Sequence, residues 1–395
     1  MLQGSEHGPI QSSSSRLPAV AMELSASRTR CPTMQALPLL LLFLLAASSM
    51  ALPVQPAMDR VRWQVEKANR RGPSIGLVMS DVDEATALQS SGYFRPWHVL
   101  PFVDLYGRRF HIGSIRGVNV IYALTGQRRL NAAVTVQTLI DVFSVSGIVH
   151  YGTAGSSNDS MSFGDVSVPK FVAYTGAWTW KKFRSSKESA TELRFGEYNV
   201  PNGGENLLGA LKFRNEELYS VGKPMKEVFW LPVDSAWFKI AEELKVRDGI
   251  RMPVWCLCLI IYIQKVVVIV KFLKVKLERC NDTFCLPTTP KVVCGLKGSS
   301  ADMFLDNAEY RKFLFREFGV STVDEESAAV VMTTTSPGVP VIVFRGVSDL
   351  AGGEPTWSST SLMNLASINA LKVAVEFIAT VGKQKSTTLA QSTNN

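Results

Sequence analysis

The sequence predicts an α/β fold, a three-layer αβα sandwich built around a central mixed, largely parallel sheet. The chain has 395 residues, of which 46% are hydrophobic and only 19% charged, so it can bury a large core and is too apolar to be disordered. Short apolar runs rich in Val and Ile, typical of buried strands, alternate with stretches of helical periodicity. This alternation is typical of parallel sheets covered by helices.

The elements of the first half follow from their apolar patterns. Buried strands are predicted at 74–79, 110–115, 118–124, 148–151 and 165–173, and helices around 84–88 and at 129–143. Arg116-Gly117 is predicted to be the turn between two of these strands. Residues 184–225 are polar and rich in glycine, which indicates a long loop region.

The second half continues the pattern up to a last helix. Helices are predicted at 237–245, 307–318, 326–335 and 361–381, and strands at 291–295, 321–323 and 339–345. The domain therefore spans residues 74–382, and residues 383–395 are expected to be a disordered tail. In sheets of this type ligands bind beyond the carboxyl ends of the strands. The loops that surround one common site are thus those after Val78, Leu124, Tyr151 and Val347.

Residues 1–51 are expected to be an N-terminal extension with a signal peptide. The apolar run 37–47 is too short to span a bilayer, is preceded by Arg28 and Arg30, and is followed by small residues. This is the layout of a secretory signal peptide cleaved near Ala51, and the alternative is a signal anchor. We therefore expect the protein to enter the secretory pathway and to be extracellular or vacuolar.

Secretion permits two further features. Asn158 and Asn281 each begin an N-glycosylation tripeptide. Cys280 and Cys285 flank a short loop, and an oxidising compartment would allow them to form a disulfide. The sequence shows no paired Cys/His spacing typical of a zinc site, so neither a metal nor a cofactor is expected.

Residues 246–276 are predicted to be an insertion within the domain. Seven basic and two acidic residues lie between 246 and 279, so this region supplies much of the net charge of +8. The apolar stretch 253–273 is nearly long enough to span a membrane, but Lys265 at its centre costs roughly 2.5–3.5 kcal/mol. We interpret 246–276 as an unspliced or wrongly delimited gene segment, and the alternative is a membrane-contacting insertion. Outside it, no basic run with interleaved aromatics suggests a nucleic-acid partner.

Three acidic residues fall at strand ends or helix starts, namely Glu84, Glu326 and Asp349. Each has an ordinary structural explanation. Glu84 can be an exposed helix residue, Glu326 can complement a helix dipole, and Asp349 can be a helix N-cap.

The surrounding motifs carry a resemblance. Residues 323–331 and 341–351 resemble the closing signature of the nucleoside phosphorylase and nucleosidase superfamily. The resemblance is closest to plant bark and vegetative storage proteins, whose kin include the 5′-methylthioadenosine/S-adenosylhomocysteine nucleosidases, and it extends over about 75–381 apart from the insertion. The other matching motifs are 125–126 with 131–133, 151–155, 163–165 and 300–304.

The resemblance implies an enzyme that cleaves the N-glycosidic bond of a purine nucleoside, by phosphorolysis or hydrolysis. Phosphate is then a possible co-substrate, and a homo-oligomer is expected by analogy. The alternative is a storage protein with the same fold and little or no catalysis. A third and less favoured class is a membrane or nucleic-acid binder.

The resemblance also implies a role for each matching residue. Asp349 matches the acid at purine N7, Glu84 the base that activates water, Glu326 the carboxylate that binds ribose hydroxyls, and Phe304 the ring under the base. The remaining substrate-binding positions are Thr125, Gly126, Gly152 and Gly155.

Three positions depart from the pattern of the nucleosidases. Glu325 stands where Met packs on the sugar, and no second acid follows Asp349 closely. Arg128 stands where Gly is expected; a residue with a side chain does not readily adopt φ > 0, but Arg128 offers a cation to phosphate. These departures count against methylthioadenosine as a good substrate.

Overall fold

The computed structural model describes residues 54–181, 192–194, 210–244, 275–281, 284–352 and 359–392. The chain divides into two compact units, Met1–Pro56 and Ala57–Asn395, and the boundary falls in the first turn of α2 (Val54–Asn69). Everything below concerns the second unit. The predicted signal peptide lies outside the described residues. Of the predicted insertion 246–276, residues 246–274 also lie outside them. Val275 is buried in the core, so this end of the predicted insertion belongs to the fold.

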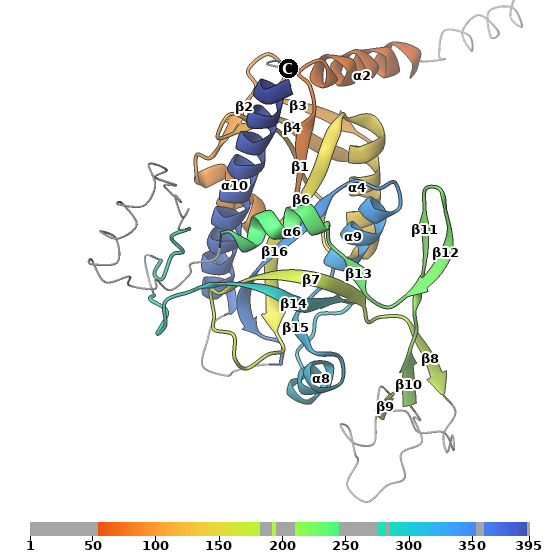
Figure 1. Cartoon of the computed structure of the whole chain (residues 1–395), viewed down its shortest axis with the longest axis vertical. Helices are drawn as coiled ribbons and strands as arrows, with labels where there is room; N and C mark the ends of the chain where they lie inside the picture. The colour runs from red at the N-terminus through yellow and green to blue at the C-terminus, as the bar shows by residue number, and fades with distance from the viewer. Residues whose placement is uncertain are drawn as a thin grey trace, which may run out of the picture. The chain divides into compact units, whose positions relative to one another are not determined.

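An 11-stranded mixed sheet forms the centre of the fold (Figure 1). Its strands are β1 (Ser74–Met79), β2 (Phe94–Pro96), β3 (Phe102–Leu105), β4 (Arg108–Ile115), β5 (Val118–Leu124), β6 (Val145–Ser156), β7 (Val166–Tyr174), β13 (Leu231–Pro232), β14 (Val292–Ser300), β15 (Val320–Asp324) and β16 (Val341–Leu350). The order is β13-β7-β14-β15-β6-β1-β5-β4-β2, with β16 on β6 and β7 and β3 on β4.

Parallel pairs dominate the middle of this sheet. β1 runs parallel to β5 and β6, β16 runs parallel to β6, and β14 runs parallel to β7 and β15. The outer strands β2, β3, β4 and β13 pair antiparallel, as do β15 with β6 and β16 with β7. The predicted mixed, largely parallel sheet is confirmed.

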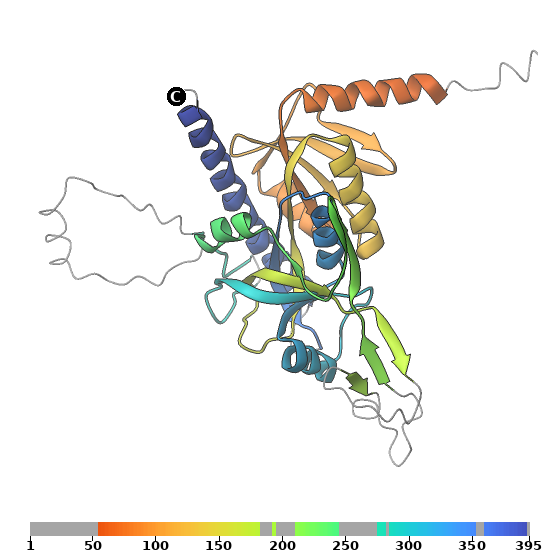
Figure 2. The same ribbon diagram turned by 45° about the vertical axis from the view of Figure 1, so that its right-hand side comes forward.

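Helices cover both faces of the sheet (Figures 1 and 2). On one face α4 (Arg129–Val142) packs on α9 (Ser327–Thr335). On the other, α10 (Ser359–Ser392) contacts α3 (Val82–Ser90) and α6 (Ser235–Glu242). The three-layer αβα prediction is therefore confirmed.

The helix α10 is the long core helix of the domain. Its segment Leu362–Gln384 is long and apolar enough to cross a membrane, but 72% of its most apolar part is buried inside the fold, as expected of a core helix. The helix continues to Ser392, so the predicted disordered tail from residue 383 is wrong over this stretch. Neither Gly nor Pro follows Gly382 in it, and Lys, Gln, Ala and Leu favour helix.

The predicted loop 184–225 instead contains strands where it is described. β8 (Trp178–Lys181), β10 (Ala210–Phe213) and β9 (Glu192–Arg194) form a small sheet, and β11 (Glu216–Ser220) pairs with β12 (Lys223–Val228). β8, β10, β11 and β12 are short and mostly exposed or half-buried, so their polar sequences lack the apolar alternation that marks a strand. Leu211 is buried in a second apolar cluster with Phe313, in α8 (Ala308–Phe313).

Two central strands are longer than predicted. β6 continues through Gly152–Gly155, which the sequence analysis placed beyond the strand, and β16 includes Asp349. Small residues have low strand propensity, but here β6 pairs with β1, β15 and β16 at once. Tertiary pairing therefore extends these strands into the site.

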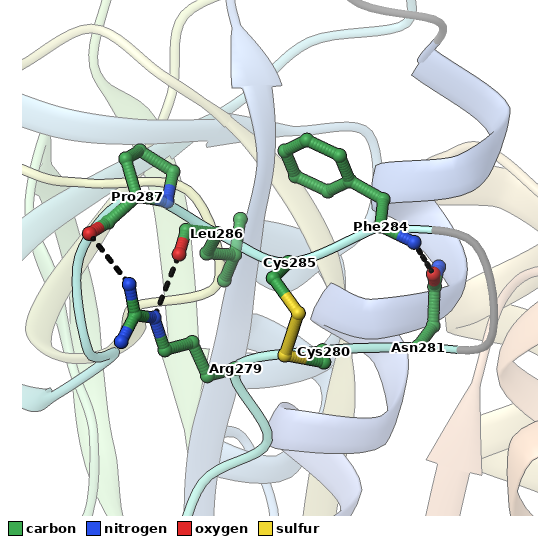
Figure 3. Close-up of a disulfide and its surroundings, with 7 residues drawn as sticks. All are labelled: Arg279, Cys280, Asn281, Phe284, Cys285, Leu286 and Pro287. Atoms are coloured by element: carbon green, nitrogen blue, oxygen red, sulfur yellow. Dashed lines mark hydrogen bonds between the residues drawn. A yellow bond between two sulfur atoms is a disulfide. The ribbon is translucent and has the colours of Figure 1, made fainter.

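The predicted disulfide between Cys280 and Cys285 is present, with an S–S distance of 2.00 Å (Figure 3). The loop is anchored from both sides. Arg279 donates to the carbonyl oxygens of Leu286 and Pro287 at 2.8 and 3.1 Å, and Leu286 is buried against α10 residues. The Phe284 amide donates to Asn281 Oδ1 at 2.8 Å.

The two predicted glycosylation sites differ in burial. Asn158 is 8% exposed, and its Nδ2 donates to Ser321 Oγ at 3.2 Å, so the predicted glycan there is contradicted. Asn281 is only half-buried. We expect peptide mapping of the secreted protein to find a glycan at Asn281 and none at Asn158. A glycan on Asn158 would contradict this burial. Asn281→Gln, which removes the acceptor at position 281, is the matched control.

Candidate active site

The carboxyl ends of β1, β5, β6 and β16 meet at one edge of the sheet, because these strands run parallel. A cavity of about 250 Å³ opens there. The predicted site residues that line it are Glu84, Arg128, Gly155, Phe304, Glu326 and Asp349. The three carboxylates singled out from the sequence therefore share one cavity.

Glu84 is held rigidly at the start of α3. Asp81 caps this helix, and Glu84 completes a capping box by accepting from the Asp81 amide at 3.1 Å. Its carboxylate also accepts from the amides of Ser80 at 2.8 Å and Thr153 at 2.7 Å. Burial raises the pKa of Glu84, although Arg345 and these amides oppose the shift. Glu84 is therefore a buried, oriented carboxylate rather than the exposed helix residue considered above.

Arg345 pairs with three of the acids at the site, and it was not among the site residues predicted from the sequence. Its guanidinium is fully buried on β16 and faces three carboxylates. Nε lies 2.9 Å from Asp324 Oδ2, Nη2 lies 3.2 Å from Glu326 Oε2, and Nη1 lies 4.0 Å from Glu84 Oε1. One cation thus serves three acids, and the excess negative charge must be held by hydrogen bonds or by protons.

Of these three carboxylates, that of Asp324 lies nearest to the Arg345 guanidinium. Burial alone would raise its pKa, but Arg345 and the hydroxyls of Ser300 and Ser327 outweigh burial and lower it. Its Oδ1 also accepts from the amides of Glu326 and Ser327 at 3.0 and 2.9 Å, which caps α9. Asp324 is therefore the ionised partner of Arg345.

His150 completes the cluster as a neutral ring. Nδ1 lies 3.3 Å from the Val78 carbonyl oxygen and so carries the proton, which leaves Nε2 to accept from Arg345 Nη2. Burial and the neighbouring Arg345 lower the pKa of His150 to about 3. His150 therefore orients Arg345 without adding charge.

Glu326 occupies the N-cap position of α9 without a capping hydrogen bond from its side chain, and it lines the cavity. Its Oε1 accepts from the Arg128 amide at 2.9 Å. Burial raises the pKa of Glu326 to about 7; Arg345 opposes the shift and Asp324 adds to it. Near neutral pH this carboxyl can therefore both accept and donate hydrogen bonds.

The raised pKa of Glu326 has a consequence for stability. Glu326 favours the folded state below the unfolded-state pKa of 4.5, and this contribution is lost as pH rises to about 7. Between these limits, wild type should lose stability relative to Glu326→Gln by up to about 1.4 kcal/mol per pH unit. Chemical denaturation across the range measures the difference. Glu227→Gln, at an exposed position on β12, is the control variant.

Asp349 also lines the cavity, and among the described residues it is not one of the three acids that pair with Arg345. Its Oδ2 accepts from Ser348 Oγ at 2.7 Å. Burial raises the pKa of Asp349, against the Ser348 hydrogen bond and with a contribution from Asp306. A Cβ on Gly155 would stand 2.9 Å from Asp349 Oδ1, so glycine makes room for this carboxyl. The position suits a proton donor.

Apolar side chains also line the cavity. Met303, Phe304, Leu305, Leu314 and Met363 contribute to its wall. Phe304 is 76% exposed, so its ring is available to stack on a flat ligand. The lining of the cavity thus combines carboxylates with apolar side chains.

Three predicted substrate-binding residues serve the framework instead. Of the described residues, Thr125 and Gly126 do not line the cavity, and Thr125 Oγ1 donates to the Gly126 carbonyl at 2.7 Å. Gly152 does not line it either. A Cβ there would stand 2.3 Å from Glu84 Oε1 and 2.4 Å from Arg345 Nη1, so Gly152 makes room for that pair.

Arg128 adopts the backbone conformation that the sequence analysis reserved for glycine. Its φ of 74° and ψ of 160° lie in a region that side chains rarely enter. This geometry aims the Arg128 amide at Glu326. The side chain is 66% exposed, and its Nε lies 3.7 Å from Glu325 Oε2. The Arg128 guanidinium, which was predicted to bind phosphate, is therefore already paired with the Glu325 carboxylate.

Replacing Arg128 with glycine should stabilise the fold. The strain is of order 1–3 kcal/mol, and the extra chain entropy of glycine offsets about 0.5–1 kcal/mol of its relief. We expect a net gain of about 1 kcal/mol in the free energy of unfolding by urea. The same change at Arg129, the first residue of α4, should destabilise. Equal losses at both positions would contradict the strain.

A signal for Arg345 exists in the sequence, as the one charged residue of the run 341–347. Such a residue is expensive to bury alone and so implies buried partners. Within the described residues, no group of three or more His, Cys, Asp and Glu side chains is arranged to hold a metal ion.

Comparison with known proteins agrees with this geometry. The profile of the family described as the phosphorylase superfamily matches residues 74–379. Bark storage protein A of Populus deltoides is 38% identical over 308 residues, which are 78% of this chain and 88% of that protein. A 5′-methylthioadenosine/S-adenosylhomocysteine nucleosidase of Halalkalibacterium halodurans is 21% identical over 275 residues, 69% of this chain and 86% of that one.

A solved structure shares the fold. The 5′-methylthioadenosine/S-adenosylhomocysteine nucleosidase of S. pneumoniae, in complex with a transition-state inhibitor, superimposes with a TM-score of 0.50. Its sequence identity is 16%, and the match covers 78% of this chain and 99% of that chain. At this identity the likeness concerns the fold alone.

Proposed function

The chain belongs to the phosphorylase superfamily, and from that premise we propose that it hydrolyses the N-glycosidic bond of a purine nucleoside. The observation that carries the proposal is the single cavity shared by Glu84, Glu326 and Asp349. Carboxylates suit this reaction because its transition state resembles an oxocarbenium ion, which negative charge stabilises.

Each side chain has a distinct task in the proposed reaction. Asp349, with its raised pKa, donates a proton or hydrogen bond to the departing purine. Glu326 accepts hydrogen bonds from ribose hydroxyls. Glu84, oriented by three amides, accepts a proton from the attacking water. Phe304 stacks on the base, and Arg345 keeps Glu84 and Glu326 in place without touching the substrate.

The charges around the cavity favour water over phosphate as the nucleophile. Six carboxylates line it, namely Asp81, Glu84, Asp324, Glu325, Glu326 and Asp349. The lining holds one basic side chain among the described residues, Arg128, and this side chain faces Glu325. A phosphate dianion would be repelled at such short range.

Product analysis tests the proposal. The full-length secreted protein is incubated with adenosine, inosine and methylthioadenosine, with and without phosphate. We expect free base and free ribose, at a rate that phosphate does not raise. Ribose 1-phosphate as product would replace hydrolysis by phosphorolysis. Base release no greater than that of Asp349→Asn would end the proposal of catalysis.

A second candidate function is storage. Its support is the 38% identity to bark storage protein A over most of both chains. From the signal-peptide pattern around residues 37–47 we also propose that the protein is secretory, either extracellular or vacuolar, and by analogy with the family that it assembles as a homo-oligomer. Quantifying the protein through the year decides between the functions. Seasonal abundance without turnover favours storage, whereas a low constant level counts against it.

A further inference from the structure

Glu325 lines the cavity next to Glu326 but stands outside the Arg345 cluster. Among the described residues its one ion pair is with Arg128, whose Nε lies 3.7 Å from Oε2, beyond hydrogen-bond distance. Among the described residues, no donor forms a hydrogen bond to the Glu325 carboxylate. Glu325 therefore has unused acceptor capacity in the cavity.

We propose that Glu325, with Arg128 beside it, is a specificity residue that selects nucleosides with a hydrogen-bond-donating or cationic substituent on the sugar. The inference rests on the proposed function, because Glu326 is taken to bind the ribose 2′- and 3′-hydroxyls. The 5′-substituent is then the other variable group of the sugar. Glu325 and Arg128 line the same cavity beside Glu326, and the 5′-substituent is assigned to them as part of the proposal.

Burial gives this carboxylate its discriminating power. The Glu325 side chain is only 16% exposed. Burial raises its pKa; Arg128 opposes the shift, and Asp302 and Asp324 add to it. A ligand hydroxyl or ammonium would pair with the carboxylate, whereas an apolar group would desolvate it without compensation. Hydrogen bonds to charged groups contribute about 1.5–3 kcal/mol, so selection of about 10- to 100-fold is expected.

The neighbouring charges are already paired, which leaves Glu325 as the acid available to a ligand. Asp302 lies 3.0 Å from Arg129 Nε, accepts from the Arg129 amide at 3.1 Å, and accepts from Tyr174 Oη at 3.2 Å. Glu326 is bound by Arg345 and by the Arg128 amide. An anionic 5′-group such as a phosphate would face an uncompensated carboxylate and be rejected.

Three nucleosides that differ only at the 5′ position test the proposal. They are adenosine, 5′-deoxyadenosine and 5′-amino-5′-deoxyadenosine, which carry a hydroxyl, a methyl group and an ammonium. In wild type, kcat/KM should be about 10- to 100-fold higher for the hydroxyl and ammonium compounds than for the methyl compound. Glu325→Met should remove this preference. Glu325→Gln should keep the preference for the hydroxyl and lose that for the ammonium.

Controls separate this inference from the proposed function. Glu227→Gln should leave all three ratios unchanged, and thermal unfolding shows whether the Glu325 variants fold. Equal ratios in wild type and Glu325→Met would overturn the subsite. If wild type turns over none of the three, the proposed function fails, and calorimetric Kd values for the same compounds then test the subsite. Binding without the stated order, or no binding, overturns it.

Discussion

Replacing Asp349 with asparagine should lower kcat by about 10²- to 10⁴-fold, the range typical of a general acid. Asparagine keeps the size and can accept the Ser348 hydrogen bond, but it has no proton to give to the departing base. The carboxyl lines a cavity that also has apolar side chains in its wall, and burial raises its pKa. Base release, followed by ultraviolet absorbance at saturating substrate, measures the loss.

The pH profile separates this role from a structural one. Because the acid must be protonated, activity falls as pH rises through the pKa of Asp349. The charge of Asp306 helps to raise that pKa. Asp306→Asn, at an exposed position, should keep kcat near that of wild type and move the alkaline limb to lower pH. An unchanged kcat in Asp349→Asn would remove Asp349 from catalysis.

Periodicity predicted the fold because local pattern and tertiary pairing agree in the central strands. Ser74–Met79 has a single polar residue, Ser74, and is buried on both faces, so its sequence alone identifies a central strand. The turn predicted at Arg116-Gly117 is also present. Both residues have positive φ, at 51° and 84°, as two-residue hairpin turns require. By contrast, β10, β11 and β12 are short and exposed, and only their partners make them strands.

The site was half predictable for a related reason. Glu84, Glu326 and Asp349 stand at the ends of elements, where a sequence pattern places them. Gly152 was misjudged because the atoms that exclude its Cβ belong to Glu84 and Arg345. These residues lie far away in the sequence, and no local pattern encodes the contact. The same holds for His150 on β6, because its role depends on the guanidinium of Arg345, which is far away in sequence but lies on the neighbouring strand β16.

The second large effect is expected at Arg345. Replacing it with methionine removes the one cation shared by Glu84, Asp324 and Glu326, while its apolar chain still fills the space. Breaking a buried ion pair from one side costs about 3–5 kcal/mol, because the remaining charges stay buried. Domains are stable by only about 5–15 kcal/mol, so this variant should be near its folding limit. Urea unfolding at pH 8 measures the loss.

Two comparisons make the argument specific to the buried acids. Arg109→Met breaks an exposed pair, in which Nε lies 2.8 Å from Asp104 Oδ1, and should cost far less stability than Arg345→Met. The loss in Arg345→Met should also shrink at pH 5, because acids deprived of their cation become protonated at higher pH and then need no partner. Arg345→Lys should retain part of the stability, since it keeps the charge but not the planar fork. A loss in Arg345→Met that is the same at pH 5 and pH 8 would mean that packing, and not charge, holds the cluster together.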